Sequence, residues 1–223
     1  MTAVIGELLP LALGIAISPI PIIAAILMLL SPRAKSTGLG FLAGWVGGVA
    51  VAVTLFTLLS TLIPADDPDA SKPLVGTLKI VLGALLVLLA LRQWRSRPGP
   101  RETAALPKWM SAIDTMTVAR ALMLGVVLSA LNPKNLVMAV SAGVVVGASG
   151  LSGGDTVIVL VVFTLLAVSS VLVPVVGYLF ASAAMRAPLE RLRVWLVQNN
   201  ATVMSILLLV IGVVSIGKGL GSF

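Results

Sequence analysis

The sequence predicts an all-α polytopic membrane protein that crosses the bilayer six times. Hydrophobic residues make up 59% of the 223-residue chain and charged residues only 10%, whereas soluble domains carry about 25% charged residues. The chain contains six apolar segments, each near or above the roughly 20 residues that a helix needs to cross a bilayer. None shows the short alternating pattern of barrel strands. Helices are therefore expected, because they satisfy their own backbone hydrogen bonds in lipid.

The predicted spans alternate with short polar connections. The spans cover approximately residues 4–30, 39–63, 73–91, 119–148, 156–183 and 201–220. The connections between them are residues 31–38, 64–72, 92–118, 149–155 and 184–199. The first, third and fifth connections hold ten of the 15 Lys and Arg residues. Because Lys and Arg concentrate in cytoplasmic loops, we predict that the N-terminus and the C-terminus both lie outside.

The six spans divide into two halves of three. Residues 1–91 form the predicted first repeat, residues 92–118 a basic cytoplasmic linker, and residues 119–223 the second repeat. Each half starts with a long helix broken by proline and continues with a long and then a shorter helix. Since three is an odd number, the second half must run in the opposite sense, as in the inverted repeats of transporters. Residue identity between the halves is negligible, so this prediction rests on hydropathy and on the positions of the breaks.

Two helix breaks occupy corresponding places in the two halves. Pro19 and Pro133 are 114 residues apart, and a proline inside a helix removes a hydrogen-bond donor and clashes with the preceding turn. The carbonyls that are freed must face protein, water or a ligand, and matched breaks indicate a transport site near the midplane. The alternative is a pair of ordinary proline kinks. The candidate substrate or ion pathway consists of Ser18, Pro19, Pro21, Asn132, Pro133, Lys134 and Asn135.

Lys134 is the most informative of these residues, because its position in the fourth span places it near the middle of the bilayer. A charge there costs at least about 2.5 kcal/mol on insertion scales and usually marks function. Lys134 could bind an anionic group of a substrate, pair with a carboxylate and change partner, or be held by freed carbonyls in a purely structural role. Glu7, Lys79 and Asp114 are candidate accessory charges near the ends of spans. No carboxylate is expected at mid-depth, so the sequence shows no simple proton relay.

Composition argues against several other functions. The chain has no Cys and no His, which predicts no disulfide, no thiol chemistry, no metal site and no cofactor. Without a close pair of carboxylates either, an enzyme is not expected. The cations flank apolar spans, so nucleic acid is not an expected partner. Gly40, Gly44 and Gly48 share one helical face, and this seam could serve a homodimer or packing within the chain.

Several motifs resemble those of one transporter superfamily. Ser18-Pro-Ile-Pro21 and the glycine-rich Gly38-Leu-Gly-Phe-Leu-Ala-Gly44 resemble the start of the lysine-exporter superfamily, which also has an N-P-K motif in its fourth helix. The segments at 92–95 and 107–114, followed by Asn132-Pro-Lys-Asn135, resemble its actinobacterial glycolipid-addressing branch, the GAP family, which includes the sulfolipid-addressing protein. The S-P-I-P break differs from the P-G-P type of amino-acid exporters, which weakens the case for an amino acid as cargo.

The resemblance implies an exporter in the cell's inner membrane. The leading hypothesis is an alternating-access protein that moves a small amphipathic or anionic solute or a cell-envelope glycolipid. Its expected partners are membrane lipids and that cargo. The second hypothesis is an accessory membrane subunit that assists a separate glycolipid exporter. Transport by the purified protein in liposomes would distinguish the two.

Overall fold

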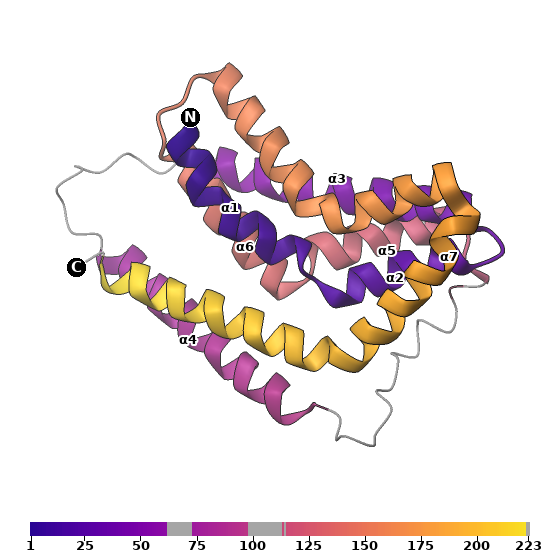
Figure 1. The fold of residues 1–223 in the computed structure, drawn as a ribbon. Coiled ribbons are helices and arrows are strands. Elements are labelled where there is room, and N and C mark those ends of the chain that lie inside the picture. Colours follow the sequence, from indigo (N-terminus) through magenta and orange to yellow (C-terminus); the bar gives the residue numbers. More distant parts are fainter. Residues whose placement is uncertain (62–72, 98–112, 114, 222–223) are drawn as a thin grey trace. The chain divides into compact units, whose positions relative to one another are not determined.

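The computed structural model describes residues 1–61, 73–97, 113 and 115–221 (Figure 1). Within these residues the regular elements are helices, which confirms the predicted all-α class. They are α1 (Thr2–Ala16), α2 (Pro19–Leu30), α3 (Ala34–Thr61), α4 (Pro73–Arg95), α5 (Val118–Ala130), α6 (Pro133–Gly147) and α7 (Gly153–Leu220). Asp114 and the side chain of Lys79 lie outside the described residues, so their predicted accessory roles stay predictions.

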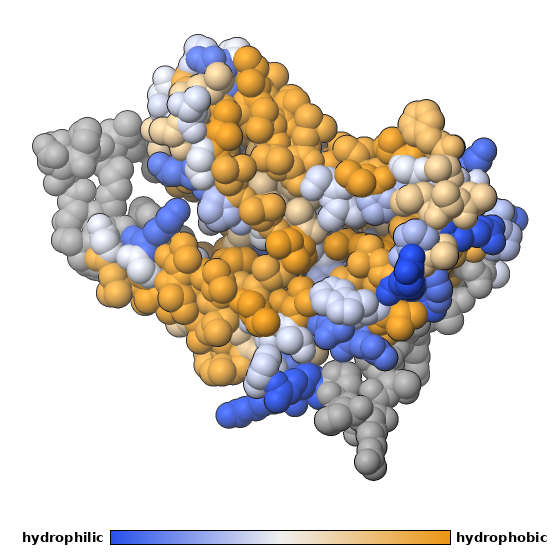
Figure 2. Space-filling view, viewed as in Figure 1, coloured by the Kyte–Doolittle hydropathy of each residue, from blue (hydrophilic) through white to orange (hydrophobic). Residues whose placement is uncertain are grey.

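Among the described helices, two are long and apolar enough to cross a membrane, or up to four stretches if each of two bent helix pairs is one span. By length and composition α3 and α7 each qualify alone. The pairs α1–α2 and α5–α6 qualify as bent spans, with angles of 55° and 64° at their breaks. Large hydrophobic side chains are exposed along the helices, including Val51, Leu131 and Phe180. Figure 2 shows hydrophobic residues over much of the visible surface, as lipid contact requires. These features indicate a membrane protein, while the count of six spans stays a prediction.

Residues 184–199, the predicted connection between the fifth and sixth spans, are helical in the structure. α7 continues through them, and its one non-helical backbone conformation lies at Ala181, with φ −139° and ψ 54°. The physical reason is the composition of the segment, which is rich in Leu, Arg and Ala. These residues favour helix, so polarity alone does not end the helix here.

The chain packs as two compact units. The first contains residues 1–63 and 105–197, and therefore α1, α2, α3, α5, α6 and the first part of α7. The second contains residues 64–104 and 198–223, and therefore α4 and the last part of α7. Each unit combines segments that are far apart in the sequence, so the units do not coincide with the predicted repeats. The division into repeats at 1–91 and 119–223 stays a prediction.

In the first unit, the predicted glycine seam of α3 packs against α5. A Cβ atom on Gly44 would lie 2.0 Å from the carbonyl oxygen of Leu122, and one on Gly48 would lie 1.9 Å from Ser129 Oγ. On the facing helix, a Cβ on Gly125 would lie 2.4 Å from the carbonyl oxygen of Phe41. The seam lets the backbones of α3 and α5 approach closely. It therefore serves packing within the chain.

The second unit uses the same device. A Cβ on Gly83 would lie 2.7 Å from the carbonyl oxygen of Gly212, and one on Gly219 would lie 2.8 Å from that of Gly76. The earlier glycine of α4 therefore meets the later glycine of α7, so the two segments run antiparallel. Small residues at both crossings allow helices to pack closely where lipid supplies no hydrophobic driving force.

The seam of the first unit predicts a contrast between neighbouring glycines. Gly44→Ala should lower the stability by about 1–3 kcal/mol, because the added methyl group collides with the backbone of α5. Gly47→Ala is the matched control, since a Cβ there meets nothing within 4 Å, and alanine favours helix over glycine by up to ~1 kcal/mol. Thermal unfolding of both variants in one detergent measures the difference. Equal midpoints would show that the close approach at Gly44 is not real.

Candidate functional site

The first break separates α1 from α2 at Ile17 and Ser18. Pro19 and Pro21 have no N–H to donate, and the N–H of Ser18 bonds to the carbonyl of Ala16 at 2.9 Å. In an uninterrupted helix that N–H would instead bond to the carbonyl of Gly14, four residues earlier. The break therefore frees the Gly14 carbonyl for a partner from elsewhere in the fold.

The second break separates α5 from α6 at Leu131 and Asn132. Asn132 caps α6, because its side-chain oxygen accepts a hydrogen bond from the backbone N–H of Lys134 at 3.0 Å. Pro133 takes the first helical position, where its missing N–H is not needed. One carbonyl that this break frees is that of Leu128, which accepts a hydrogen bond from Asn135 Nδ2 at 3.1 Å.

Lys134 joins the two breaks. Its amine Nζ donates a hydrogen bond to the carbonyl of Gly14 in the first broken helix. Gly14 and Leu128 are 114 residues apart, the same spacing as Pro19 and Pro133. The first turn of α6 thus supplies a side chain to one freed carbonyl at each break. The bond from Lys134 adds to the packing of α1 against α6.

A third side chain, from α7, forms a hydrogen bond with a backbone carbonyl at the first break. Ser170 of α7 donates a hydrogen bond from its hydroxyl to the carbonyl of Ala16 at 2.6 Å. The sequence analysis did not single out Ser170, although Ser169-Ser170 interrupts the apolar middle of the fifth predicted span. A polar pair at that depth is the signal that could have indicated it, because polar groups in lipid need partners.

The break site is buried and retains unused polar atoms. Lys134 is 3% exposed, while Ser18 and Asn135 are 2% exposed. Among the described residues, four buried side-chain atoms lack a hydrogen-bond partner, and two of them lie at the breaks: Ser18 Oγ and Asn135 Oδ1. An unsatisfied buried group costs about 1–3 kcal/mol. The site therefore holds a hydroxyl and an amide oxygen that a polar ligand or a water molecule could satisfy.

The remaining predicted residues are placed differently. Pro19 and Pro21 are buried in the first break, whereas Pro133 is exposed and Asn132 is half-buried. Glu7 is exposed on α1, and no described carboxylate forms an ion pair with Lys134. In the part of the chain that the structure describes, the partner of Lys134 is therefore a neutral carbonyl.

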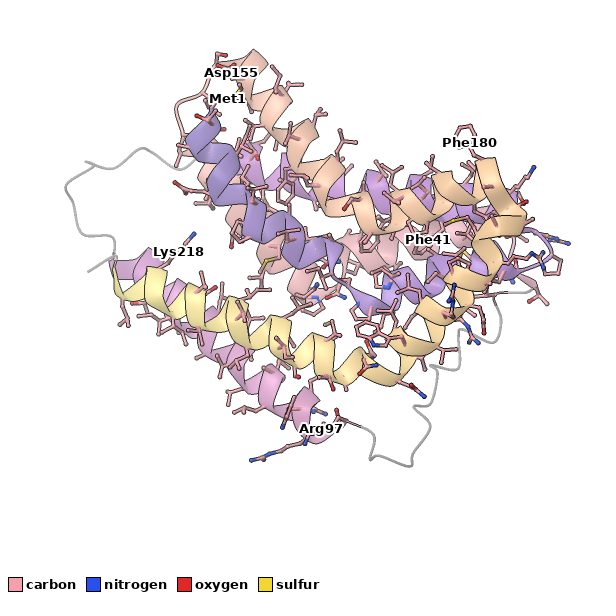
Figure 3. The ribbon with its side chains drawn as sticks, viewed as in Figure 1. Met1, Phe41, Arg97, Asp155, Phe180 and Lys218 are labelled. Atoms are coloured by element: carbon pink, nitrogen blue, oxygen red, sulfur yellow. The ribbon has the colours of Figure 1, made fainter. Side chains whose placement is uncertain are left out.

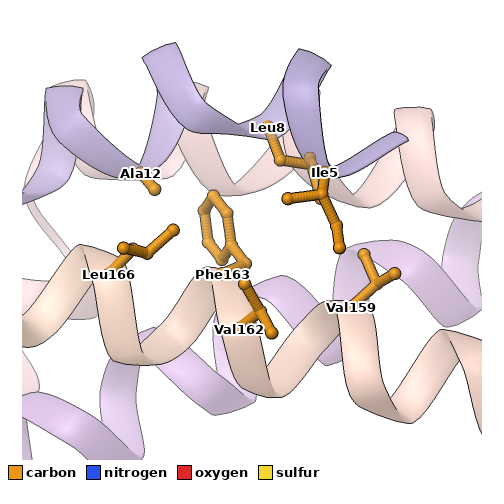
Figure 4. Close-up of a pocket in the computed structure, with 7 residues that line it drawn as sticks. All are labelled: Ile5, Leu8, Ala12, Val159, Val162, Phe163 and Leu166. Carbon is orange, nitrogen blue, oxygen red and sulfur yellow. The ribbon is translucent and has the colours of Figure 1, made fainter. Parts of the chain in front are cut away.

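A small pocket along α1 is wholly apolar (Figure 4). It lies between α1 and α7 and has no room for a water molecule. Its walls consist of Ile5, Leu8, Ala12, Val159, Val162, Phe163 and Leu166. The pocket is thus a packing contact that holds α1 on α7, and the polar chemistry of this unit's interior is at the breaks.

These features define a class: a helical membrane protein whose two proline-broken helices are joined by a buried lysine. The family model described as "Sap, sulfolipid-1-addressing protein" matches residues 8–221 of the chain, so the protein belongs to that family. The prediction of a glycolipid-addressing family is confirmed, whereas membership of the lysine-exporter superfamily stays a prediction. No match was found among curated proteins or among solved structures.

The lysine bridge predicts a change in local backbone protection. Lys134→Met should speed hydrogen exchange of the amides at the first break about tenfold, because the Gly14 carbonyl loses a hydrogen bond of roughly 1.5 kcal/mol. Ser170→Ala should have a smaller effect, since the carbonyl of Ala16 keeps the N–H of Ser18. Exchange monitored by mass spectrometry compares the two variants. Similar protection in Lys134→Met and the parent protein would contradict the bridge.

Proposed function

We propose that this protein is an inner-membrane exporter that moves an anionic or amphipathic solute or a cell-envelope glycolipid by alternating access. The observation that carries the proposal is the bond between Lys134 and the freed carbonyl of Gly14. It ties one broken helix to the other through a single group that an anionic cargo can also bind. Loading of cargo would then release one helix from the other.

The chemistry favours an exchange of partners at Lys134. A protonated lysine amine has three N–H donors, and the structure assigns a described partner, the Gly14 carbonyl, to one of them. A buried cation whose partner is neutral is costly in a medium of low dielectric constant. Charge-assisted hydrogen bonds to an anion are roughly twice as strong as bonds between neutral groups. An anionic group therefore competes well with Gly14 for the amine.

The family supports the class of cargo. Its printed description concerns the addressing of sulfolipid-1, and the sulfate ester of such a lipid is an anion. Ser18 Oγ and Asn135 Oδ1, both without partners, are available for the hydroxyl groups of a sugar or for an accompanying water. We propose that Lys134 binds the acidic group while these two atoms bind neutral polar groups.

The topology belongs to the same proposal. Six spans arranged as two inverted repeats of the lysine-exporter superfamily would allow the halves to rock around the breaks. Both termini would lie outside, because ten of the 15 cations fall in the three connections assigned to the cytoplasm. The angles of 55° and 64° at the two breaks support bent spans of similar form.

Transport by purified protein tests the proposal. In liposomes loaded with a sulfated glycolipid, Lys134→Gln and Lys134→Ala should each lower the flux at least about tenfold, because the anionic group loses a charge-assisted hydrogen bond worth about 1.5–3 kcal/mol. The matched control is Arg191→Gln, which removes an exposed cation of α7 outside the break site. Unchanged flux in both Lys134 variants would overturn the role of this residue.

A second candidate function is an accessory subunit of a separate lipid exporter. The word "addressing" in the family's description favours it, because addressing does not require transport by the same chain. In this case the purified protein would show no flux in liposomes, and flux would appear only when a partner exporter is reconstituted with it. Flux from the purified protein alone would exclude the accessory function.

A further inference from the structure

A basic pocket lies at the opposite end of α2 from the first break. It has a volume of about 540 Å³ and is lined by residues 31–36, which connect α2 to α3 and form the start of α3, and by Tyr178, Ser182 and Arg186 of α7. The two groups of residues are far apart in sequence, but both belong to the first unit. The twelve residues of α2 separate the pocket from the first break by about 18 Å. The pocket is thus distinct from the Lys134 site.

Three cations line this pocket: Arg33, Lys35 and Arg186. None of them forms an ion pair with a carboxylate among the described residues. The acidic residue that follows Arg186 on α7 is Glu190, and both of its oxygens accept hydrogen bonds from Arg193. The same hydrogen bonds hold the pKa of Glu190 below its usual value. The pocket therefore carries positive charge that no described carboxylate neutralises.

Hydrogen-bond donors without a partner also line the pocket. Tyr178 lines the pocket and is only 4% exposed, and its hydroxyl has no hydrogen-bond partner in the part of the chain that the structure describes. The pocket also contains the start of α3, a helix of 28 residues. The backbone N–H groups of Lys35 and Ser36 have no backbone partner there. Free N–H groups at a helix N-terminus favour anions.

The size and surroundings of the pocket indicate the kind of anion. A volume of about 540 Å³ lies in the range of sites for small molecules and exceeds what a bare inorganic ion fills. Phe180, two residues after Tyr178, is 88% exposed and projects away from α7 in Figure 3. An exposed aromatic ring on the helix that lines the pocket fits a surface in contact with lipid. We infer that this pocket binds the phosphate or sulfate ester headgroup of a membrane lipid.

In this arrangement Arg33 and Arg186 contact the ester oxygens, because a guanidinium donates two parallel hydrogen bonds to such a group. Tyr178 and the N–H groups of α3 donate to the same oxygens, and the acyl chains leave the pocket toward the surrounding lipid. The inference does not depend on transport at Lys134. A lipid bound here would join the start of α3 to α7 at the Ala181 kink.

Binding of short-chain lipids to the purified protein tests this inference. Dioctanoyl phosphatidylglycerol should bind at least about tenfold more tightly than dioctanoyl phosphatidylcholine or inorganic phosphate. The double variant Arg33→Gln/Arg186→Gln should lose at least tenfold in affinity for phosphatidylglycerol. Tyr178→Phe keeps the ring that packs in the core and should lose about threefold to tenfold. Isothermal titration calorimetry in one neutral detergent measures the affinity of the parent protein for each of the three ligands and that of both variants for phosphatidylglycerol.

The matched control for charge is Arg191→Gln together with Arg95→Gln, which removes two exposed cations outside the pocket. This variant should bind phosphatidylglycerol as the parent protein does. Equal losses in the pocket and control variants would show general attraction to positive charge and overturn the site. Inorganic phosphate binding as tightly as the lipid would overturn the assignment to a lipid headgroup. Unchanged affinity in correctly folded Tyr178→Phe would remove the tyrosine from the site.

Discussion

The hydrogen bond from Lys134 to the carbonyl of Gly14 is the interaction on which the interior of the first unit depends. Proline breaks free backbone carbonyls that lipid cannot satisfy, and the first turn of α6 satisfies one carbonyl at each break. Asn135 bonds to the carbonyl of its own preceding helix, whereas Lys134 reaches the other broken helix. The break in the first helix thereby exposes a carbonyl through which α6 contacts α1. We propose that the same amine can also bind an anion.

Much of this site could be predicted from the sequence, because prolines and a lysine in an apolar run are costly and therefore informative. The two breaks, the burial of Lys134 and the glycolipid-addressing family all followed from short motifs. The partner of Lys134 could not be predicted, since hydropathy does not show which carbonyl a side chain meets. Ser170 was missed for the same reason. The helical form of the connection at 184–199 could not be predicted from its charges, which do not show its helix propensity.

Close backbone packing and anionic recognition occur at different places in the molecule. Glycines bring α3 against α5 and α4 against the last part of α7, so each unit has a rigid pair of helices. The proposed cargo site and the basic pocket lie in the first unit, at the two ends of α2. Since α2 begins at a break and ends at the pocket, a movement of α2 would affect both. In our proposal, this arrangement links lipid bound in the basic pocket to the cargo site at the breaks.

The account makes one central claim, that Lys134 exchanges the carbonyl of Gly14 for an anionic group of the cargo. The most direct measurement is a pair of electron cryo-microscopy structures, with an antibody fragment as a size marker, obtained without and with a sulfated glycolipid. Without lipid, the amine of Lys134 should contact the carbonyl of Gly14. With lipid, non-protein density should contact the amine, and the contact to Gly14 should be lost. An amine that stays on Gly14, with lipid density only elsewhere, would contradict the account.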